Sequence, residues 1–127
     1  LNREQLIGGE VFSHEGDFTE TLLFTGVIRG CVPNVGISAS TGIYTWAELT
    51  KVLLAGADTA QMCTAVYKQG ATAIAEALKG LRHWMLEHGY QSLSELRGRL
   101  SYGAVADPSL FERIQFMKYF NARAAQD

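Results

Sequence analysis

The sequence predicts an α/β fold, and the order of its short patterned segments leads to this prediction. A short apolar stretch at residues 35–39 precedes a helical pattern at residues 45–55, and a second short stretch follows at residues 59–63. Strand, helix and strand in so few residues make a βαβ unit, whose strands pair in parallel with a right-handed crossover. The chain beyond this unit has helical patterning. We therefore expect a short parallel sheet with helices packed beside it.

The first predicted helix begins after Asp17 and ends near Gly30. Asp17 and Glu20 have the spacing of a capping box. Apolar residues at helical spacing follow, namely Leu22, Leu23, Val27 and Ile28. Pro33 then predicts a turn at residues 31–34, because proline lacks an N–H donor and restricts the residue before it. Before this helix, residues 1–16 are weakly patterned, with residues 10–13 as a candidate edge strand.

The helix at residues 45–55 has clear signals at both ends. Thr45 and Glu48 form a capping box, in which each side chain accepts from the backbone N–H of the other. Gly56 stands where a C-terminal cap glycine belongs. One face of this helix carries Trp46, Leu49, Val52 and Leu53.

Three further helices are predicted after the second strand. The helix at residues 71–88 ends at Gly89, and its apolar stripe consists of Ile74, Leu78, Leu81 and Met85. Ser92 and Glu95 open a short helix through another capping box. Asp107 and Pro108 are an N-cap followed by proline at the first helical position. This last helix carries Leu110, Ile114 and Met117 on one face.

Composition limits the classes of function. The 127 residues suit one domain, and a net charge of −2 without a Lys/Arg run gives no electrostatic support for nucleic-acid binding. No apolar run reaches the roughly 18 residues that span a bilayer. Cys31 and Cys63 match no metal or redox spacing, which indicates free thiols in a reducing compartment. We therefore expect a cytoplasmic protein without a nucleic-acid or membrane partner.

The segment SASTGIY at residues 38–44 is a candidate phosphate-binding loop. This loop and the turn at residues 63–65 leave neighbouring strands at their carboxyl ends, where parallel α/β folds bind ligands. Backbone N–H groups at helix N-termini favour a phosphate dianion. Gly42 allows close approach, and the hydroxyl groups of Ser40, Thr41 and Thr64 can donate. Alternatively, the small residues only permit a tight turn between strand and helix.

Longer sequence runs resemble a known family. The run ISASTGIYTWAELTKVLLAGADTAQMCTAVYKQG and the later LEHGYQSLSELRGRLS resemble the C-terminal end of flavin-dependent dihydroorotate dehydrogenases, in particular their divergent bacterial branch. In that family a Gly-Gly-Ile loop after the seventh barrel strand and a Gly-Thr turn after the eighth hold the phosphate of FMN. Thr41-Gly42-Ile43 takes the first position and Cys63-Thr64 the second. LLAGAD and DPSLFERIQFMKYF also match, so the resemblance covers roughly residues 17–120.

The resemblance implies the C-terminal portion of a (β/α)8 TIM barrel. Residues 1–127 would be a single partial domain, with βα units at 17–69 and C-terminal helices at 70–127. It implies FMN as cofactor and a small-molecule substrate in the full-length protein, with oxidation of dihydroorotate to orotate in pyrimidine biosynthesis. The residues that would bind FMN are Ala39, Ser40, Thr41, Gly42, Cys63 and Thr64.

This sequence departs from the family pattern in two ways. Thr41 and Cys63 stand where better-studied members have glycine, so side chains narrow the space for the phosphate. The family's catalytic base, a Cys or Ser on a loop in mid-barrel, has no counterpart here, and Cys31 lies in a turn that cannot replace it. We therefore assign no catalytic residue, and we expect this chain alone to be inactive.

Two interpretations remain open from the sequence. The chain is the phosphate-binding end of an FMN-dependent oxidoreductase, or it is a non-catalytic module that binds a phosphate or a partner. About eight strands close a barrel, so either the sequence belongs to a longer protein or its helices cover a short sheet in a smaller domain. In the first case we expect apolar faces around Leu22, Leu53 and Leu81 and the edge of residues 35–37 to be uncovered, so that the isolated chain oligomerises, aggregates or binds an apolar dye.

Other polar residues give weaker signals. His14, His83 and His88 form no ligand pair, so we predict no metal site. Gln61 is the one residue with a side-chain amide within the predicted strands. We expect its amide to point into the barrel and to find a hydrogen-bond partner there.

Overall fold

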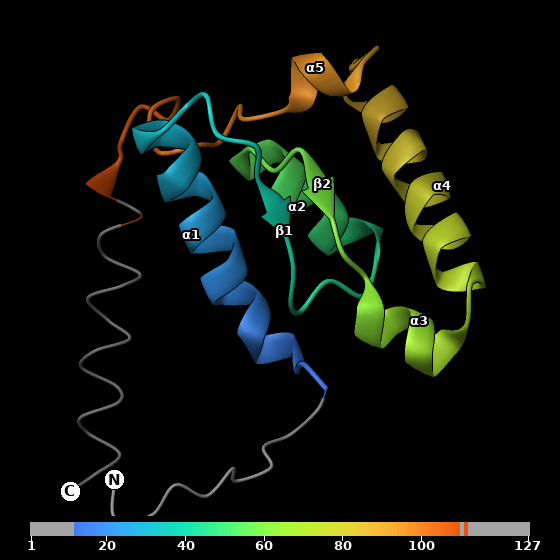
Figure 1. Cartoon of the computed structure of the whole chain (residues 1–127). Helices are drawn as coiled ribbons and strands as arrows, with labels where there is room; N and C mark the ends of the chain where they lie inside the picture. The colour runs from blue at the N-terminus through green and yellow to red at the C-terminus, as the bar shows by residue number, and fades with distance from the viewer. Residues whose placement is uncertain (1–11, 110, 112–127) are drawn as a thin grey trace, which may run out of the picture.

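Two short parallel strands lie side by side at the centre of the chain (Figure 1). The computed structural model describes residues 12–109 and 111. Strand β1 (Ser38–Ala39) pairs with β2 (Thr59–Ala60), with Ser38 opposite Thr59 and Ala39 opposite Ala60. Helix α2 (Trp46–Ala55) connects them, so the predicted strand–helix–strand unit with parallel pairing is confirmed.

The remaining helices lie around this unit. A 3-10 turn η1 (Glu15–Asp17) leads into α1 (Phe18–Cys31), and α3 (Cys63–Gln69), α4 (Thr72–Glu87) and α5 (Leu93–Leu96) follow β2. In Figure 1 the strands lie in front of α2, with α1 on one side and α4 on the other. Helix α2 contacts both of these helices. No helix of the described part is long and apolar enough to cross a membrane.

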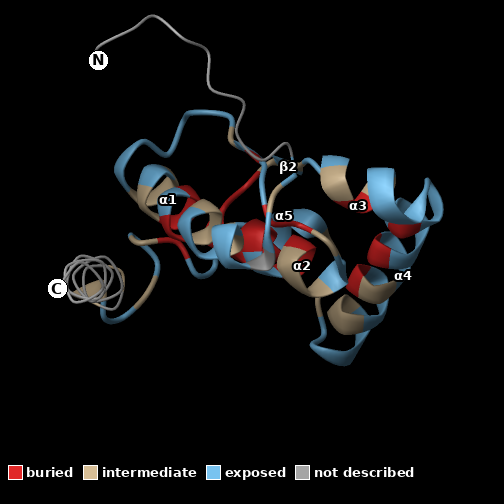
Figure 2. Ribbon diagram, turned by 90° about the horizontal axis from the view of Figure 1, so that it is seen from below, coloured by how far each residue is buried: buried red, intermediate tan, exposed pale blue. Residues whose placement is uncertain are grey.

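Helix α2 is the centre of the hydrophobic core. Its buried face consists of Leu49, Val52, Leu53 and Leu54, and Val52 is fully buried. Leu81 of α4 and Leu96 of α5 pack against this face, and Figure 2 shows the buried residues along the same region. The sequence-predicted face is confirmed except at Trp46, which is 42% exposed.

Both strands are shorter than the sequence predicted. The expected strands covered residues 35–39 and 59–63, whereas each observed strand has two residues. The carboxylate of Asp58 accepts the backbone N–H of Ile37 at 2.8 Å. This side-chain bond takes the place of a ladder bond, so regular pairing begins only at Ser38. At the other end, Cys63 is already the first residue of α3, a helix that the sequence analysis described only as a turn.

The predicted helix ends are mostly correct. Thr45 and Glu48 form the reciprocal capping box, and Gly56 ends α2 with a φ of 119°. Ser92 caps α5, but the Glu95 carboxylate accepts from the N–H of Gln91 at 2.8 Å rather than from that of Ser92.

The capping box at the first helix is wrong. The helix begins at Phe18 as predicted, but the Asp17 carboxylate accepts from the N–H of His14 at 2.8 Å and makes no cap bond to the helix. The preceding residues form a 3-10 turn, and this turn brings the N–H of His14 within reach of the carboxylate.

The apolar stripe of α4 is only partly buried. Leu81 is in the core, but Ile74 is 45% and Leu78 56% exposed. The buried face is instead formed by Ala73, Ala77 and Leu81. Small side chains allow α4 to approach α2 closely: a Cβ atom on Gly80 would lie 2.3 Å from Cγ of Trp46. Among the faces expected to be uncovered, Leu53 and Leu81 are therefore buried and Leu22 is half-buried.

The segment after α5 is hydrogen-bonded to the end of α2. The N–H groups of Gly98 and Leu100 donate to the carbonyls of Leu53 and Leu54 at the end of α2. Asp107 accepts the N–H of Ser109 at 3.0 Å, as expected for an N-cap. Leu110, Ile114 and Met117 of the predicted last helix lie outside the described residues, as do residues 10 and 11 of the predicted edge strand.

Candidate functional site

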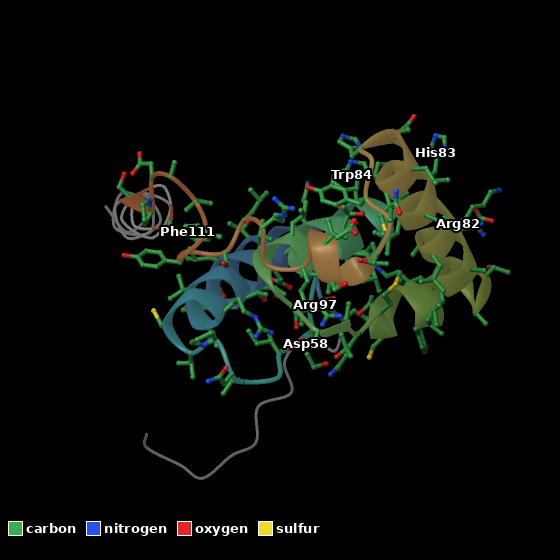
Figure 3. All side chains as sticks on the ribbon, turned by 90° about the horizontal axis from the view of Figure 1, so that it is seen from above. Asp58, Arg82, His83, Trp84, Arg97 and Phe111 are labelled. Carbon is green, nitrogen blue, oxygen red and sulfur yellow. The ribbon has the colours of Figure 1, made fainter. Side chains whose placement is uncertain are left out.

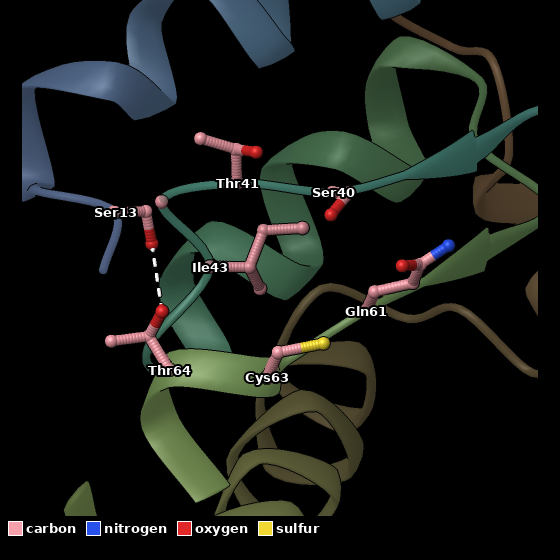
Figure 4. A pocket seen from close by; sticks show the side chains of 8 residues that line it. Ser13, Ser40, Thr41, Ile43, Gln61, Cys63 and Thr64 are labelled. Carbon is pink, nitrogen blue, oxygen red and sulfur yellow. Dashed lines mark hydrogen bonds between the residues drawn. The ribbon is translucent and has the colours of Figure 1, made fainter. Parts of the chain in front are cut away.

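The two predicted loops line one shared hollow at the carboxyl ends of the strands (Figure 4). Its volume is about 200 Å³. The described residues that line it are Ser13, Ser40, Thr41, Gly42, Ile43, Gln61, Cys63 and Thr64. Five of the six residues that the sequence indicated are therefore brought together. The sixth, Ala39, is buried in the core with 4% exposure.

The backbone of the first loop has an unusual conformation. Thr41 and Gly42 both have positive φ, at 82° and 74°. A β-branched residue rarely adopts this region, because its side chain clashes with the backbone. Thr21 of α1 fixes the loop from the other side: its hydroxyl donates to the carbonyls of Ser40 at 2.8 Å and Thr41 at 3.0 Å. The loop carbonyls are thus occupied by α1.

Gly42 has a different structural role from the one that the sequence suggested. We expected the missing side chain to leave space for a ligand. A Cβ atom at this position would lie 2.6 Å from the backbone nitrogen of Phe18 and 2.7 Å from its Cα. Glycine is therefore required by the close approach of the loop to the start of α1. Any ligand of the hollow would therefore be recognised by its other groups.

Backbone donors of both loops remain available. Within residues 12–109 and 111, the N–H groups of Thr41, Gly42, Cys63 and Thr64 donate no hydrogen bond. The last two belong to the first turn of α3, where backbone N–H groups have no partner within the helix. Thr41 and Cys63 are exposed, whereas Gly42 is buried and Thr64 is half-buried. A buried or half-buried N–H group without a protein partner is normally satisfied by water or a ligand.

A segment before α1 also reaches the hollow, which the sequence analysis missed. Ser13 Oγ lies 3.1 Å from Thr64 Oγ1 and 3.3 Å from the Tyr44 hydroxyl oxygen. The Tyr44 hydroxyl also donates to the carbonyl of Ser13. Residues 1–16 are weakly patterned, so no periodicity or motif could have placed Ser13 beside Thr64.

Gln61 follows β2 instead of lying within it. Its backbone N–H donates to the Ala39 carbonyl at 2.8 Å, and its side-chain amide donates to Ser38 Oγ at 3.0 Å. The expected hydrogen-bond partner is present. The side chain is exposed, however, and lines the hollow.

The lining of the hollow can donate hydrogen bonds to an anion. Every described residue that lines it is uncharged, and the lining offers hydroxyl groups and backbone N–H donors. No group of three or more metal-ligating side chains occurs among the described residues. Cys31 and Cys63 are both exposed and free of disulfides.

Comparison with known proteins identifies relatives of part of the chain. No protein-family model matches it. The catalytic subunit of dihydroorotate dehydrogenase B (NAD(+)) from Pyrococcus furiosus is 39% identical over 67 residues, which is 53% of this chain and 21% of that protein. A Streptococcus pneumoniae R6 protein, named "Probable dihydroorotate dehydrogenase A (fumarate)", is 33% identical over 70 residues, or 55% of this chain and 22% of that protein.

These matches extend over a limited part of each relative. The aligned segment spans about a fifth of the length of the curated relatives. Both relatives carry the name of the family that the sequence motifs suggested. The resemblance is confirmed: over about half of its length, this chain is homologous to a segment of the dihydroorotate dehydrogenases.

Proposed function

We propose that this chain is the FMN-phosphate-binding end of a flavin-dependent oxidoreductase that resembles dihydroorotate dehydrogenase. The observation that carries the proposal is the shared hollow at the ends of two parallel strands. Two loops that are distant in sequence meet there, and the homologous proteins are named as dihydroorotate dehydrogenases. In parallel α/β folds this end of the sheet is where ligands bind.

The residues of the hollow fit a phosphate group. Free N–H groups of Thr41, Gly42, Cys63 and Thr64 supply donors from the backbone, and the hydroxyls of Ser40, Thr41 and Thr64 add side-chain donors. A volume of about 200 Å³ is smaller than the roughly 300–1,000 Å³ of pockets for whole small molecules. The hollow therefore suits one end of FMN. Ala39 supports it from the core.

The role of these residues is to anchor the cofactor. FMN supplies the redox chemistry when it is bound. Donors fixed on two loops would hold its phosphate in one position, because Thr21 restrains the first loop and the backbone of α3 restrains the second. The substrate would be a small molecule, with dihydroorotate as the candidate that the homologues suggest.

The proposed architecture is the end of a (β/α)8 barrel. Residues 17–69 would supply its last two βα units, residues 70–127 its C-terminal helices, and the whole chain a partial domain. The parallel register of β1 and β2 and the helices beside them support this proposal. A two-stranded sheet of two residues per strand is too small to be stable alone, so its edges suit further strands.

Ligand comparison tests the proposed function. Binding of FMN, riboflavin and inorganic phosphate to the 127-residue chain would be measured by calorimetry and by ³¹P NMR. We expect FMN to bind more tightly than riboflavin, and phosphate to compete with FMN, because the hollow recognises the phosphate. Equal binding of FMN and riboflavin, or no binding of either FMN or phosphate, would contradict the proposal. Equal affinity for FMN and phosphate would favour a phosphate-binding module without a flavin site.

Variants then distinguish a loss of FMN binding in the hollow from a general loss of folding stability. Thr64→Ala removes one hydroxyl donor and should weaken FMN binding by about 1–2 kcal/mol. Thr45→Ala is the control, because it weakens the cap of α2 without touching the hollow. It should lower stability and leave FMN affinity unchanged. Gly42→Val is unsuitable for this purpose, since its side chain would clash with Phe18.

A further inference from the structure

We infer that Lys68 supplies the positive charge of the proposed phosphate site and determines its preference for an anion. This inference rests on the proposed function. Every described residue in the lining is uncharged, so a phosphate dianion there has only dipolar donors. Lys68 is held next to the lining, outside it, by contacts that run from its ammonium group to Thr64.

The first contact joins Lys68 to the first loop. Its Nζ atom lies 5.6 Å from the centroid of the Tyr44 ring, within the distance at which an ammonium group is attracted to the face of an aromatic ring. The Tyr44 hydroxyl in turn donates to the Ser13 carbonyl. Ser13 Oγ lies 3.1 Å from Thr64 Oγ1 in the lining. Lys68, Tyr44 and Ser13 thus form a continuous rim, which we call the Lys68 rim.

The position of Lys68 on its helix also places it near the hollow. Thr64 and Lys68 are four residues apart on α3, so their side chains lie on the same face. Side chains on a helix lean toward its N-terminus. We therefore expect the ammonium group, which lies beside the Tyr44 ring, to be on the Thr64 side of α3. Because the stem of lysine is flexible, the contact with the Tyr44 ring is what keeps the ammonium group on this side of α3.

Substitution of Lys68 tests the inference on the full chain. Affinities for FMN, inorganic phosphate and riboflavin would be measured for the parent and for Lys68→Gln at about 0.05 M and about 0.5 M salt. At low salt we expect Lys68→Gln to weaken FMN and phosphate binding about fivefold, the effect of one partly exposed ion pair. The difference should shrink at high salt, and riboflavin binding should not change.

Matched variants distinguish this role from a structural one. Lys68→Arg keeps the charge and should keep parent affinity. Lys79→Gln removes the same charge from the middle of α4, outside the lining, and should behave as the parent. Tyr44→Leu removes the ring that holds the ammonium group and should reduce the salt dependence of FMN binding, whereas Tyr44→Phe keeps the ring and should preserve it. Thermal unfolding confirms that each variant is folded.

The outcomes separate the two proposals. If the parent binds FMN and Lys68→Gln binds it with the same affinity and the same salt dependence, the inference is wrong. The proposed phosphate site is not affected by that result. If the parent binds neither FMN nor phosphate, the proposed function itself is wrong and the inference falls with it. Equal weakening by Lys68→Gln and Lys79→Gln would show a general charge effect and would also overturn the role of the Lys68 rim.

Discussion

Thr41 adopts a backbone conformation that favours glycine. Its φ is 82°, and its neighbour Gly42 has a φ of 74°. The fold therefore imposes a left-handed backbone on a β-branched residue that resists it. Two bonds from Thr21 help to hold this shape.

Replacement of Thr41 by glycine should stabilise the protein. A left-handed backbone destabilises a folded non-glycine residue by about 1–2 kcal/mol. Glycine removes this strain, but its greater freedom in the unfolded chain lowers stability by roughly 0.5–1 kcal/mol. We expect Thr41→Gly to raise the free energy of unfolding by about 0.5–1 kcal/mol in urea denaturation. A clear loss of stability would show that the Thr41 side chain makes contacts that outweigh its strain.

Gly42→Ala is the opposite substitution on the same loop. It places a Cβ atom 2.6 Å from the nitrogen of Phe18 at an already positive φ. We expect it to lower the free energy of unfolding by more than about 1 kcal/mol. Parent-like stability would mean that the loop can move away from α1.

At the scale of single elements, α2 is the best-specified helix. The Thr45 hydroxyl accepts the N–H of Ala47 at 3.2 Å, and the Glu48 carboxylate accepts the N–H of Thr45 at 2.9 Å. Partial burial raises the pKa of Glu48, and the hydrogen bonds from the hydroxyl and N–H of Thr45 lower it. The lowering is the larger effect, so the pKa of Glu48 lies below its usual range. The carboxylate therefore stays ionised at the N-terminus of α2, where the helix dipole favours a negative charge.

Removal of this cap should have a measurable cost. We expect Thr45→Ala to lower the free energy of unfolding by about 1 kcal/mol, because the first N–H groups of α2 lose their acceptor. Ser92→Ala should cost less, since the bond from Glu95 N to Ser92 Oγ is long at 3.4 Å and α5 has only four residues. Thermal denaturation of the two variants side by side gives the comparison. A larger effect at Ser92 would contradict the assigned importance of the α2 cap.

At the scale of the whole molecule, Asp58 links distant elements. Its carboxylate accepts from the N–H of Ile37 at 2.8 Å, from Arg29 of α1 at 2.5 Å and from Arg97 after α5 at 3.2 Å. Figure 3 shows Asp58 and Arg97 next to each other. Arg29 also donates to the carbonyls of Pro33 and Gly56. One carboxylate thus joins the first helix, the start of the sheet and the segment after α5.

Asp58 should make the stability of the chain sensitive to acid. The bond from the N–H of Ile37, followed by Arg29 and Arg97, lowers the pKa of Asp58 below its ordinary value of 3.8. A carboxyl whose pKa is lowered by folding stabilises the protein above its unfolded pKa. This contribution is lost as the pH falls from 3.8 through the lower folded value.

Asp58→Asn is the variant that tests this linkage. It should be less stable than the parent near neutral pH, and the difference should disappear in the acidic window just described, as measured by urea denaturation at a series of pH values. Arg29→Gln should cost more stability than Arg97→Gln, because the Arg29 side chain is 17% exposed and that of Arg97 35%. A difference that is constant with pH would contradict the role of the Asp58 carboxylate.

An apolar groove beside β2 predicts association of the isolated chain. The groove has a volume of about 250 Å³, and its lining includes the exposed side chains of Ile74, Leu78 and Leu93. Exposed apolar surface beside a free strand edge favours association and dye binding. We expect self-association in light scattering and enhanced fluorescence of an apolar dye.

A matched pair of substitutions tests the location of this surface. Leu78→Gln should reduce dye binding and association, whereas Leu86→Gln should not, because Leu86 is 69% exposed but lies outside the groove. A monodisperse parent that binds no dye would instead favour a self-contained small domain.

The sequence by itself determined most of the helix ends and five of the residues that line the hollow. Caps at Thr45 and Gly56 and the periodic apolar positions of α2 act locally, so they could be read from neighbouring residues. The parallel strand–helix–strand order followed from the same local signals, and it predicted that residues 40–42 and 63–64 would meet at one end of the sheet. The motifs also identified the homologous family.

Only the tertiary structure decided which groups these elements bring together. Ser13 reaches Thr64 across 51 positions of the sequence, and Asp58 reaches Arg97 across 39, and no local pattern encodes such pairs. Packing also decided that α4 buries Ala73 and Ala77, because the close approach to α2 selects small side chains. The same helix leaves Ile74 and Leu78 exposed. The glycine at position 42 is explained by its positive φ and its contact with Phe18, both of which arise only in the folded chain. Local propensity fixes where helices begin and end, but the close packing of distant segments fixes what each residue does.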